Sequence, residues 1–272
     1  MALLTECEAF PPIDLGVGIR IRALWNAVRW EEVRLLVDSM LPPNENALGR
    51  AWRVAVYSAA SCSDPKIMSL LCRLMPNSLL ETANIVMETI ADRPREEGTP
   101  SSLFVPDQRW EVPPAAVSGW ARGVIGGVTL ERGTSLNIAA LQEQDARRHI
   151  LASIWREQVA GLLTIVIEMG FSIAQAVTNE VGRGWLGENP VSLILPDGRI
   201  NLEPAEVLER LRGPPRTQIP RTLWQTLLLL RDTRNDLAHM RPVDYGRVRE
   251  LWQKYDQARK YFGVPQLGRG RT

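Results

Sequence analysis

The chain has 272 residues, 45% apolar and 23% charged, which are the proportions of an ordinary globular protein. Its length allows one large domain or two smaller ones. The net charge of +1 hides an asymmetry, because residues 199–272 hold 15 basic and 8 acidic residues, a net charge of +7, against −6 for residues 1–198. A basic C-terminal third fits either a surface for phosphate backbones or a solvated arginine-rich surface.

Cysteines and apolar runs indicate a cytoplasmic protein. The three cysteines, Cys7, Cys62 and Cys72, are odd in number and lack metal-ligand spacing, so we expect reduced thiols. The N-terminus lacks the basic region and apolar run of a secretory signal. Val159–Ile167 is too short to span a bilayer, and Glu168 interrupts it. We therefore expect a buried helix and no membrane span.

Residues 1–95 are predicted to form an N-terminal helical region. The first residues indicate an irregular arm, and apolar spacing over residues 18 to about 40 predicts one or two helices. Pro42-Pro43-Asn44 breaks that pattern. Asp64 before Pro65 predicts an N-cap with proline at the first helical position. Further helices are predicted over residues 46–60, 64–74 and 78–91.

Residues 96–138 are predicted to be a linker rich in proline and glycine, or an ordered strap. Residues 124–130 (VIGGVTL) predict a strand with a glycine bulge. Trp110 and Trp120 favour the strap, because such large apolar side chains are unusual in a free linker. Long helices are ruled out over residues 93–119 by prolines, namely Pro94, Pro100, Pro106, Pro113 and Pro114.

Residues 139–272 are predicted to form a second helical domain, which makes the whole chain mainly α. Residues 135–181 keep a helical period and predict one or two long helices. Residues 191–200 (VSLILPDGRI) predict a small β-hairpin insertion, with Pro and Gly placed as turns prefer. A short helix is predicted over residues 203–211. Asp244 is predicted to cap a final amphipathic helix.

A leucine-rich helix in this domain becomes polar at its end, over residues 227–242 (LLLLRDTRNDLAHMRP). Arg231, Asn235 and His239 follow at i, i+4 and i+8 and predict a polar stripe, with Arg234 beside it. Arg234 and His239 stand about 140° apart on an ideal helix. They converge only if the arginine reaches round or the last turn loosens before the closing proline. A buried stripe at helical spacing is predicted for Leu223, Leu227, Leu230 and Leu237.

The stretch RNDLAH, residues 234–239, resembles the Arg-x4-His signature of the HEPN superfamily. The resemblance covers about residues 139–265. It implies a helical bundle, metal-independent endoribonuclease activity in a defence or toxin system, and a homodimer that brings two motifs into one cleft. Some family members carry a tyrosine two residues after the histidine, where this chain has Arg241. That difference argues against the nucleotidyl-transferase-paired subgroup.

The predicted chemistry is attack of an RNA 2′-hydroxyl on the adjacent phosphorus, which leaves a 2′,3′-cyclic phosphate. His239 is the candidate acid–base group, because an imidazole exchanges protons near neutral pH. Arg234 would neutralise the pentavalent phosphorus with its planar fork, and Asn235 would orient the imidazole or the phosphate. Arg231 and Arg241 are the candidate RNA-binding residues. No metal or cofactor is expected, since two separated histidines and scattered acids give no metal site.

A structural interpretation of the same residues stays open. In it His239 caps the C-terminal end of the helix, where cations are favoured, and Arg231 and Arg234 pair with Asp232 or Asp236. The chain would then be a non-catalytic HEPN-like adaptor that binds a partner protein or a nucleotide.

Three further residues or regions have predicted roles. The N-terminal region would hold a regulatory protein partner, sense a trigger or extend the dimer. His149 is expected at the surface. Glu168 is expected to pair with an arginine, because a buried acid needs a partner.

Overall fold

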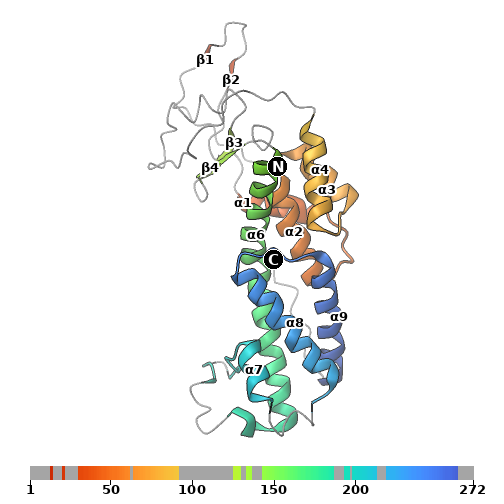
Figure 1. Ribbon diagram of the computed structural model, residues 1–272, viewed down its shortest axis with the longest axis vertical. Helices are drawn as coiled ribbons and strands as arrows, with labels where there is room; N and C mark the ends of the chain where they lie inside the picture. Colours follow the sequence, from red (N-terminus) through yellow and green to blue (C-terminus); the bar gives the residue numbers. More distant parts are fainter. Residues whose placement is uncertain are drawn as a thin grey trace.

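One long helix, α6 (Glu143–Val181), runs along most of the molecule, and the other helices pack beside it (Figure 1). The computed structural model describes residues 13–14, 20–21, 30–61, 64–91, 125–129, 133–136, 143–186, 193–196, 198–212 and 219–262. This part of the chain is mainly helical, as predicted. Helix α6 contains no proline and ends where Gly182 adopts a left-handed φ of 76°, which favours glycine at the end of a helix.

Four helices from the N-terminal part pack beside the first half of α6 (Figure 1). They are α1 (Trp30–Met40), α2 (Ala47–Ser61), α3 (Pro65–Leu74) and α4 (Leu79–Ala91). The predicted helices over 46–60, 64–74 and 78–91 are confirmed. The predicted cap is also confirmed, because the Asp64 side chain accepts hydrogen bonds from the backbone N–H groups of Lys66 and Ile67.

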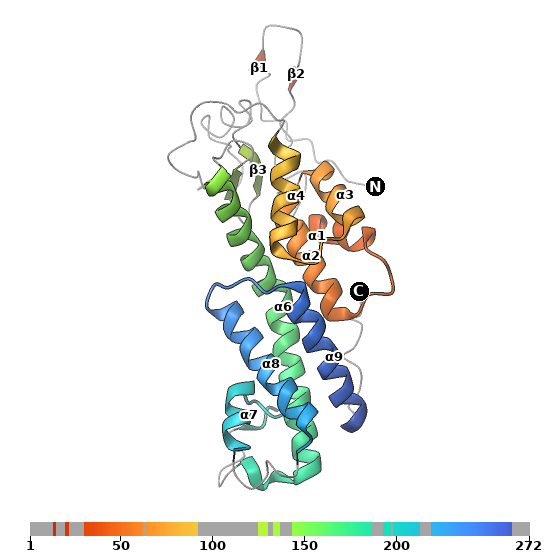
Figure 2. The same cartoon turned by 45° about the vertical axis from the view of Figure 1, so that its right-hand side comes forward.

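Three helices and a short 3₁₀ turn complete the fold beside the second half of α6 (Figure 2). The turn η2 (Arg183–Leu186) follows α6 directly. Helix α7 (Pro204–Arg210) packs on α8 (Arg221–Ala238), and α8 and α9 (Tyr245–Phe262) form a pair joined by a short loop. All four leucines of the predicted buried stripe in α8 are fully buried.

Two predictions about β-structure need correction. The helical pattern from residue 18 was wrong at its start, because β2 (Arg20–Ile21) pairs antiparallel with β1 (Ile13–Asp14), and α1 begins only at Trp30. The predicted hairpin over 191–200 was also wrong. Its ladder is reduced to a single bridge between Ile194 and Ile200, because the chain enters α7 four residues later and leaves too little length for two strands.

The strand predicted within the linker is confirmed. Strand β3 (Ile125–Thr129) pairs antiparallel with β4 (Gly133–Leu136). The register shifts between Ile125 and Gly127, where the sequence predicted a glycine bulge. The rest of the predicted linker, with Trp110 and Trp120, lies outside the described residues.

The buried side chains of both predicted helical regions form one continuous cluster along α6. The apolar stretch 159–167 lies within this helix, as expected, and Leu162 and Val166 are buried. Among the described helices, α6 is the one that is long and apolar enough to cross a membrane. It packs against α2, α4, α8 and α9, and one such helix is weak evidence for a membrane span.

Candidate functional site

The Arg-x4-His motif lies at the C-terminal end of α8. Arg231, Arg234 and Asn235 are on the last turns of the helix, and all three are partly exposed. The helix ends at Ala238, one residue before His239, whose imidazole is exposed. The loosened last turn that the sequence favoured is therefore present.

A left-handed residue closes α8. The backbone N–H of His239 donates to the Asn235 and Asp236 carbonyls at 2.9 and 3.2 Å, and that of Arg241 donates to Asp236 at 2.9 Å. Met240 between them has a φ of 59°. This is the Schellman pattern, in which glycine is usual. By its backbone, His239 is the C-cap residue that the structural interpretation required.

Three side chains from α2 and α6, of which Trp52 and Gln158 are buried and Trp155 is partly buried, fix the loop that carries His239. Trp155 Nε1 donates to the Leu237 carbonyl at 2.7 Å. Gln158 donates to the Val243 carbonyl at 2.8 Å and accepts from its N–H at 2.7 Å. Trp52 Nε1 donates to the same carbonyl at 2.6 Å. The loop is thus held at both ends, while the imidazole between them is left in solvent.

Arg234 contacts a carboxylate from another helix. Its Nη2 donates to Oε1 of Glu203 at 2.5 Å, and its Nη1 donates to Oδ1 of Asn235 at 3.4 Å. Glu203 is the residue before α7. About a third of the Arg234 side chain and half of the Glu203 side chain are exposed, at 32% and 54%. An ion pair this exposed contributes little to stability, and solvent reaches both of its side chains.

The two arginines that flank the motif, Arg231 and Arg241, differ in their contacts. Arg231 donates through Nε and Nη2 to Oδ1 of Asp232 at 2.8 and 2.7 Å. This is one of the pairs that the structural interpretation predicted. Asp232 also lies 4.0 Å from Nη1 of Arg247 on α9. The side chain of Arg241 is exposed beside the α8–α9 loop.

The structure therefore brings together only part of the predicted site. Arg234, Asn235 and the unpredicted Glu203 form one contact group. Within the described ranges, no hydrogen bond or ion pair joins the imidazole of His239 to Arg234. The two follow each other along the end of α8 but do not touch.

The roles of Glu203, Gln158 and Trp155 were not predicted from the sequence. Glu203 carries one signal, because it precedes a proline as a residue at a helix start often does. Gln158 also carries one, since it and Glu157 are adjacent polar residues in an apolar helix and both are fully buried. Neither signal names the partner, which in each case is more than 30 residues away along the chain.

Two other predictions were tested by the structure. Glu168 forms the expected ion pair, with Arg199 at 2.7 Å, but both side chains are well exposed. The surface location predicted for His149 was wrong, because the residue is half-buried. Its burial, with Arg156 nearby, lowers the pKa of the imidazole below its ordinary value.

Cysteines and possible metal ligands give no further site among the described residues. Cys72 is buried and unpaired, and burial raises the pKa of its thiol. Cys7 and Cys62 lie outside the described part of the chain. Where the structure describes the chain, no three His, Cys, Asp or Glu residues are grouped as metal ligands.

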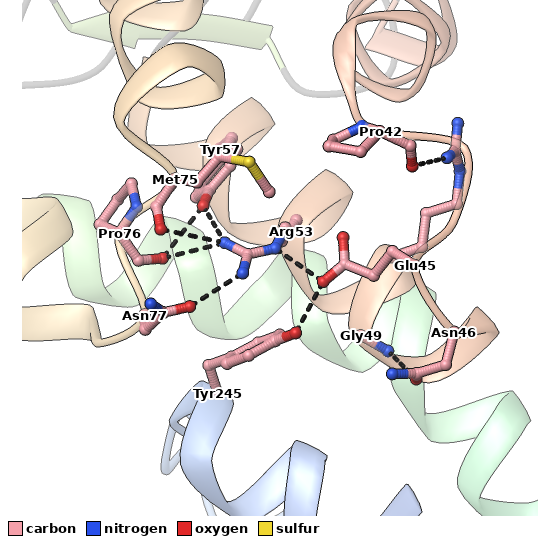
Figure 3. A network of polar contacts seen from close by, with 11 residues as sticks. Pro42, Glu45, Asn46, Gly49, Arg53, Tyr57, Met75, Pro76, Asn77 and Tyr245 are labelled. Carbon is pink, nitrogen blue, oxygen red and sulfur yellow. Dashed lines mark hydrogen bonds and ion pairs between the residues drawn. The ribbon is translucent and has the colours of Figure 1, made fainter.

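A second polar cluster, which the sequence did not indicate, surrounds Arg53 of α2 (Figure 3). We call Glu45, Arg53, Tyr57, Asn77 and Tyr245 the Arg53 cluster. Arg53 is 5% exposed. It donates to Glu45 at 2.7 Å, to Asn77 at 2.8 Å and to the Tyr57 hydroxyl at 2.5 Å. The Tyr245 hydroxyl donates to the same Glu45 oxygen at 2.7 Å.

This cluster fixes the start of α9 against the N-terminal helices. The Arg53 guanidinium also lies 4.3 Å from the centre of the Tyr245 ring, a cation–π distance. Burial raises the pKa of the Tyr57 hydroxyl, which stays protonated and donates to the Pro76 carbonyl at 3.0 Å. A buried charge needs such partners, so we assign the cluster to stability.

No protein-family model matches the chain, and neither a curated protein nor a solved structure matches it. The resemblance to the HEPN superfamily therefore depends on the motif and its place at the end of α8.

Proposed function

We propose that the chain is a metal-independent endoribonuclease of the HEPN type that acts in the cytoplasm, as a defence or toxin effector. Arg234, His239 and Asn235 form its catalytic site, and Arg231 and Arg241 bind the RNA backbone. The functional unit is a homodimer through the C-terminal half, and the N-terminal helices hold a regulatory partner.

The observation that carries the proposal is an exposed histidine on an immobilised loop. Trp52, Trp155 and Gln158 hold the backbone on both sides of His239. A purely structural cap needs no such fixed position for a side chain in solvent. Acid–base catalysis does need it, because proton transfer requires a group held within hydrogen-bond reach of the reacting atom.

The arginines support the same chemistry. A guanidinium offers five N–H donors in a planar fork that matches phosphate oxygens. Arg234 and Arg231 lie within one turn of each other on α8. Arg241 follows the histidine in a C-terminal third with a net charge of +7. An RNA backbone crossing the end of α8 would meet positive charge on both sides of the imidazole.

The alternative is a non-catalytic adaptor, and one observation favours it. Arg231 and Arg234 both have carboxylate partners, Asp232 and Glu203. In this interpretation Arg234 joins α8 to the start of α7, and Arg231 pairs within α8. The adaptor would bind a partner protein or a nucleotide without cleaving RNA.

One assay separates the two functions. Purified protein is incubated with total RNA in EDTA, and the new RNA ends are mapped. We expect 2′,3′-cyclic phosphate ends, lost in Arg234→Ala and in His239→Ala. Arg249→Ala is the matched control, since this exposed arginine lies on α9. Intact RNA with the folded wild-type protein, at every concentration tried, would favour the adaptor.

A further inference from the structure

Cleavage by 2′-hydroxyl attack needs two proton transfers, and one imidazole supplies one of them at a time. A base removes the proton of the 2′-hydroxyl, and an acid protonates the 5′-oxygen that leaves. The site proposed above contains His239 as its acid–base group, with Arg234 on the phosphate. A second acid–base group close to Arg234 would supply the other proton transfer.

Glu203 is the carboxylate that contacts Arg234 in the described part of the chain, at 2.5 Å. A phosphate bound by Arg234 would therefore share one guanidinium group with the Glu203 carboxylate. The carboxylate is 54% exposed, so a ribose has access to it. A carboxylate is ionised at neutral pH and can accept a proton.

The start of α7 holds Glu203 in this position. The next residue, Pro204, is buried against Gly170 of α6, where an added Cβ would come within 3.2 Å of the proline ring. The backbone N–H of Glu203 donates to Oε2 of Glu206 at 2.8 Å. Buried Leu202 and Val207 secure the two sides. The charged groups that face Glu203 are Arg234 from α8 and Glu206 from its own helix.

The ion pair leaves room for a phosphate on Arg234. Of the five N–H donors of a guanidinium, the contacts with Glu203 and Asn235 use one each. The remaining donors are available to phosphate oxygens. Arg234 is thus able to hold the phosphate and keep the carboxylate beside it.

We propose that Glu203 is the general base of the ribonuclease reaction, an assignment that rests on the function proposed above. Its carboxylate takes the proton of the 2′-hydroxyl as the 2′-oxygen forms a bond to phosphorus. The bond from phosphorus to the 5′-oxygen breaks, and protonated His239 gives its proton to that oxygen. The products are a 2′,3′-cyclic phosphate and a 5′-hydroxyl. Solvent then takes the proton from Glu203 and returns one to His239.

The first test compares Glu203→Gln, Glu203→Asp and Glu209→Gln in the full chain. Glu209 is the matched control, because it is an exposed carboxylate on the same helix. We expect Glu203→Gln to lower kcat about 10²–10⁴-fold with little change in KM. Glu203→Asp should keep part of the activity, and Glu209→Gln should keep all of it. Thermal unfolding of each variant checks that the helices remain folded.

The second test separates base from acid. A dinucleotide with sulfur in place of the bridging 5′-oxygen has a leaving group that needs no protonation. On it, His239→Ala should regain most of the wild-type rate, whereas Glu203→Gln should stay slow. If Glu203→Gln regains the rate instead, the assignment of Glu203 as base is overturned.

Failure of this inference and failure of the proposed function give different results. Suppose the wild type cleaves RNA and Arg234→Ala and His239→Ala do not. If Glu203→Gln then cleaves RNA at the wild-type rate or faster, Glu203 is not the base, but the proposed function still holds. A variant faster than the wild type would show that the Glu203 carboxylate competes with phosphate for Arg234. A folded wild type that cleaves nothing removes both.

Discussion

The chain has two histidines, and the structure gives them opposite surroundings. His239 ends a helix in solvent, whereas His149 is half-buried in α6 with Arg156 nearby. Burial and a neighbouring positive charge both disfavour the charged imidazole. Protonation of His149 therefore acts on the stability of the fold.

His149 predicts a loss of stability in mild acid. Because the folded-state pKa is lowered, the unfolded chain binds the proton first as the pH falls below about 6.5. The stabilisation is complete above that pH and is lost as the pH falls toward the folded-state value, by at most about 1.4 kcal/mol per pH unit. Denaturant unfolding of wild type and His149→Gln from about pH 7.5 down to about pH 5, which covers roughly 1–1.5 pH units on either side of the unperturbed pKa, tests this.

The variant His149→Gln separates this residue from the carboxylates that also titrate in acid. Glutamine fills a similar volume and carries no charge. We expect the difference in unfolding free energy between the two proteins to change with pH in the stated direction. A difference that stays constant would mean that the burial of His149 has no energetic effect.

Met240 predicts a gain in stability on substitution by glycine. A side chain in the left-handed region costs roughly 1–2 kcal/mol. Glycine removes this cost, but it also raises the conformational entropy of the unfolded chain, which offsets part of the stabilisation. Met240→Gly should therefore raise the unfolding free energy by about 0.5–1 kcal/mol, measured by denaturant unfolding. Met240→Ala keeps the strain and should change little. Destabilisation by glycine would show that the methionine side chain, although 71% exposed, makes contacts worth more than the strain.

At the scale of the element, periodicity predicted most of the fold. Helices α2, α3 and α4 and the buried stripe of α8 follow from apolar spacing, because burial of one face needs only local sequence. The prediction of a hairpin over 191–200 was wrong although the turn residues are suitable. Too few residues separate the turn from α7 to form a second strand. The Arg234–Glu203 contact could not be predicted, since it depends on how α7 packs against α8. The Gln158–Val243 contact likewise depends on how α6 lies beside the α8–α9 loop.

Gln158 is fully buried in α6 and anchors the α8–α9 loop. Its amide satisfies both backbone groups of Val243, and Gln158→Leu leaves a buried N–H without a partner. One such unsatisfied group costs roughly 1–3 kcal/mol, so the unfolding free energy should fall by about 1–3 kcal/mol. The amide hydrogen of Val243 should also exchange faster.

Gln175→Leu is the matched control for this change. Gln175 lies on the same helix and bonds only to Asn179 among the described residues, at an exposed position. Its loss should stay within about 0.5 kcal/mol. Equal unfolding free energies for the two variants would show that Gln158 does not stabilise the loop.

At the scale of the molecule, α6 serves both regions that the sequence separated. Gly161 of α6 approaches Ala55 of α2, and Gly170 approaches Pro204 of α7. The Arg53 cluster adds a second connection, from α2 to the start of α9. The division into residues 1–95 and 139–272 stays a prediction from composition. A core shared along one helix instead favours a single cooperative unit.

Met169→Ala tests that cooperativity from one end of the core. Met169 is fully buried beside Gly170, and its truncation should cost about 2–5 kcal/mol. If the helices unfold together, the slowest-exchanging amides of α2 should lose the same opening free energy as those of α8, measured by hydrogen exchange. Thr164→Ala, at an exposed position of the same helix, should change neither. Loss of protection in α8 alone would mean that α1–α4 unfold independently, and that residues 96–138 do separate two folding units.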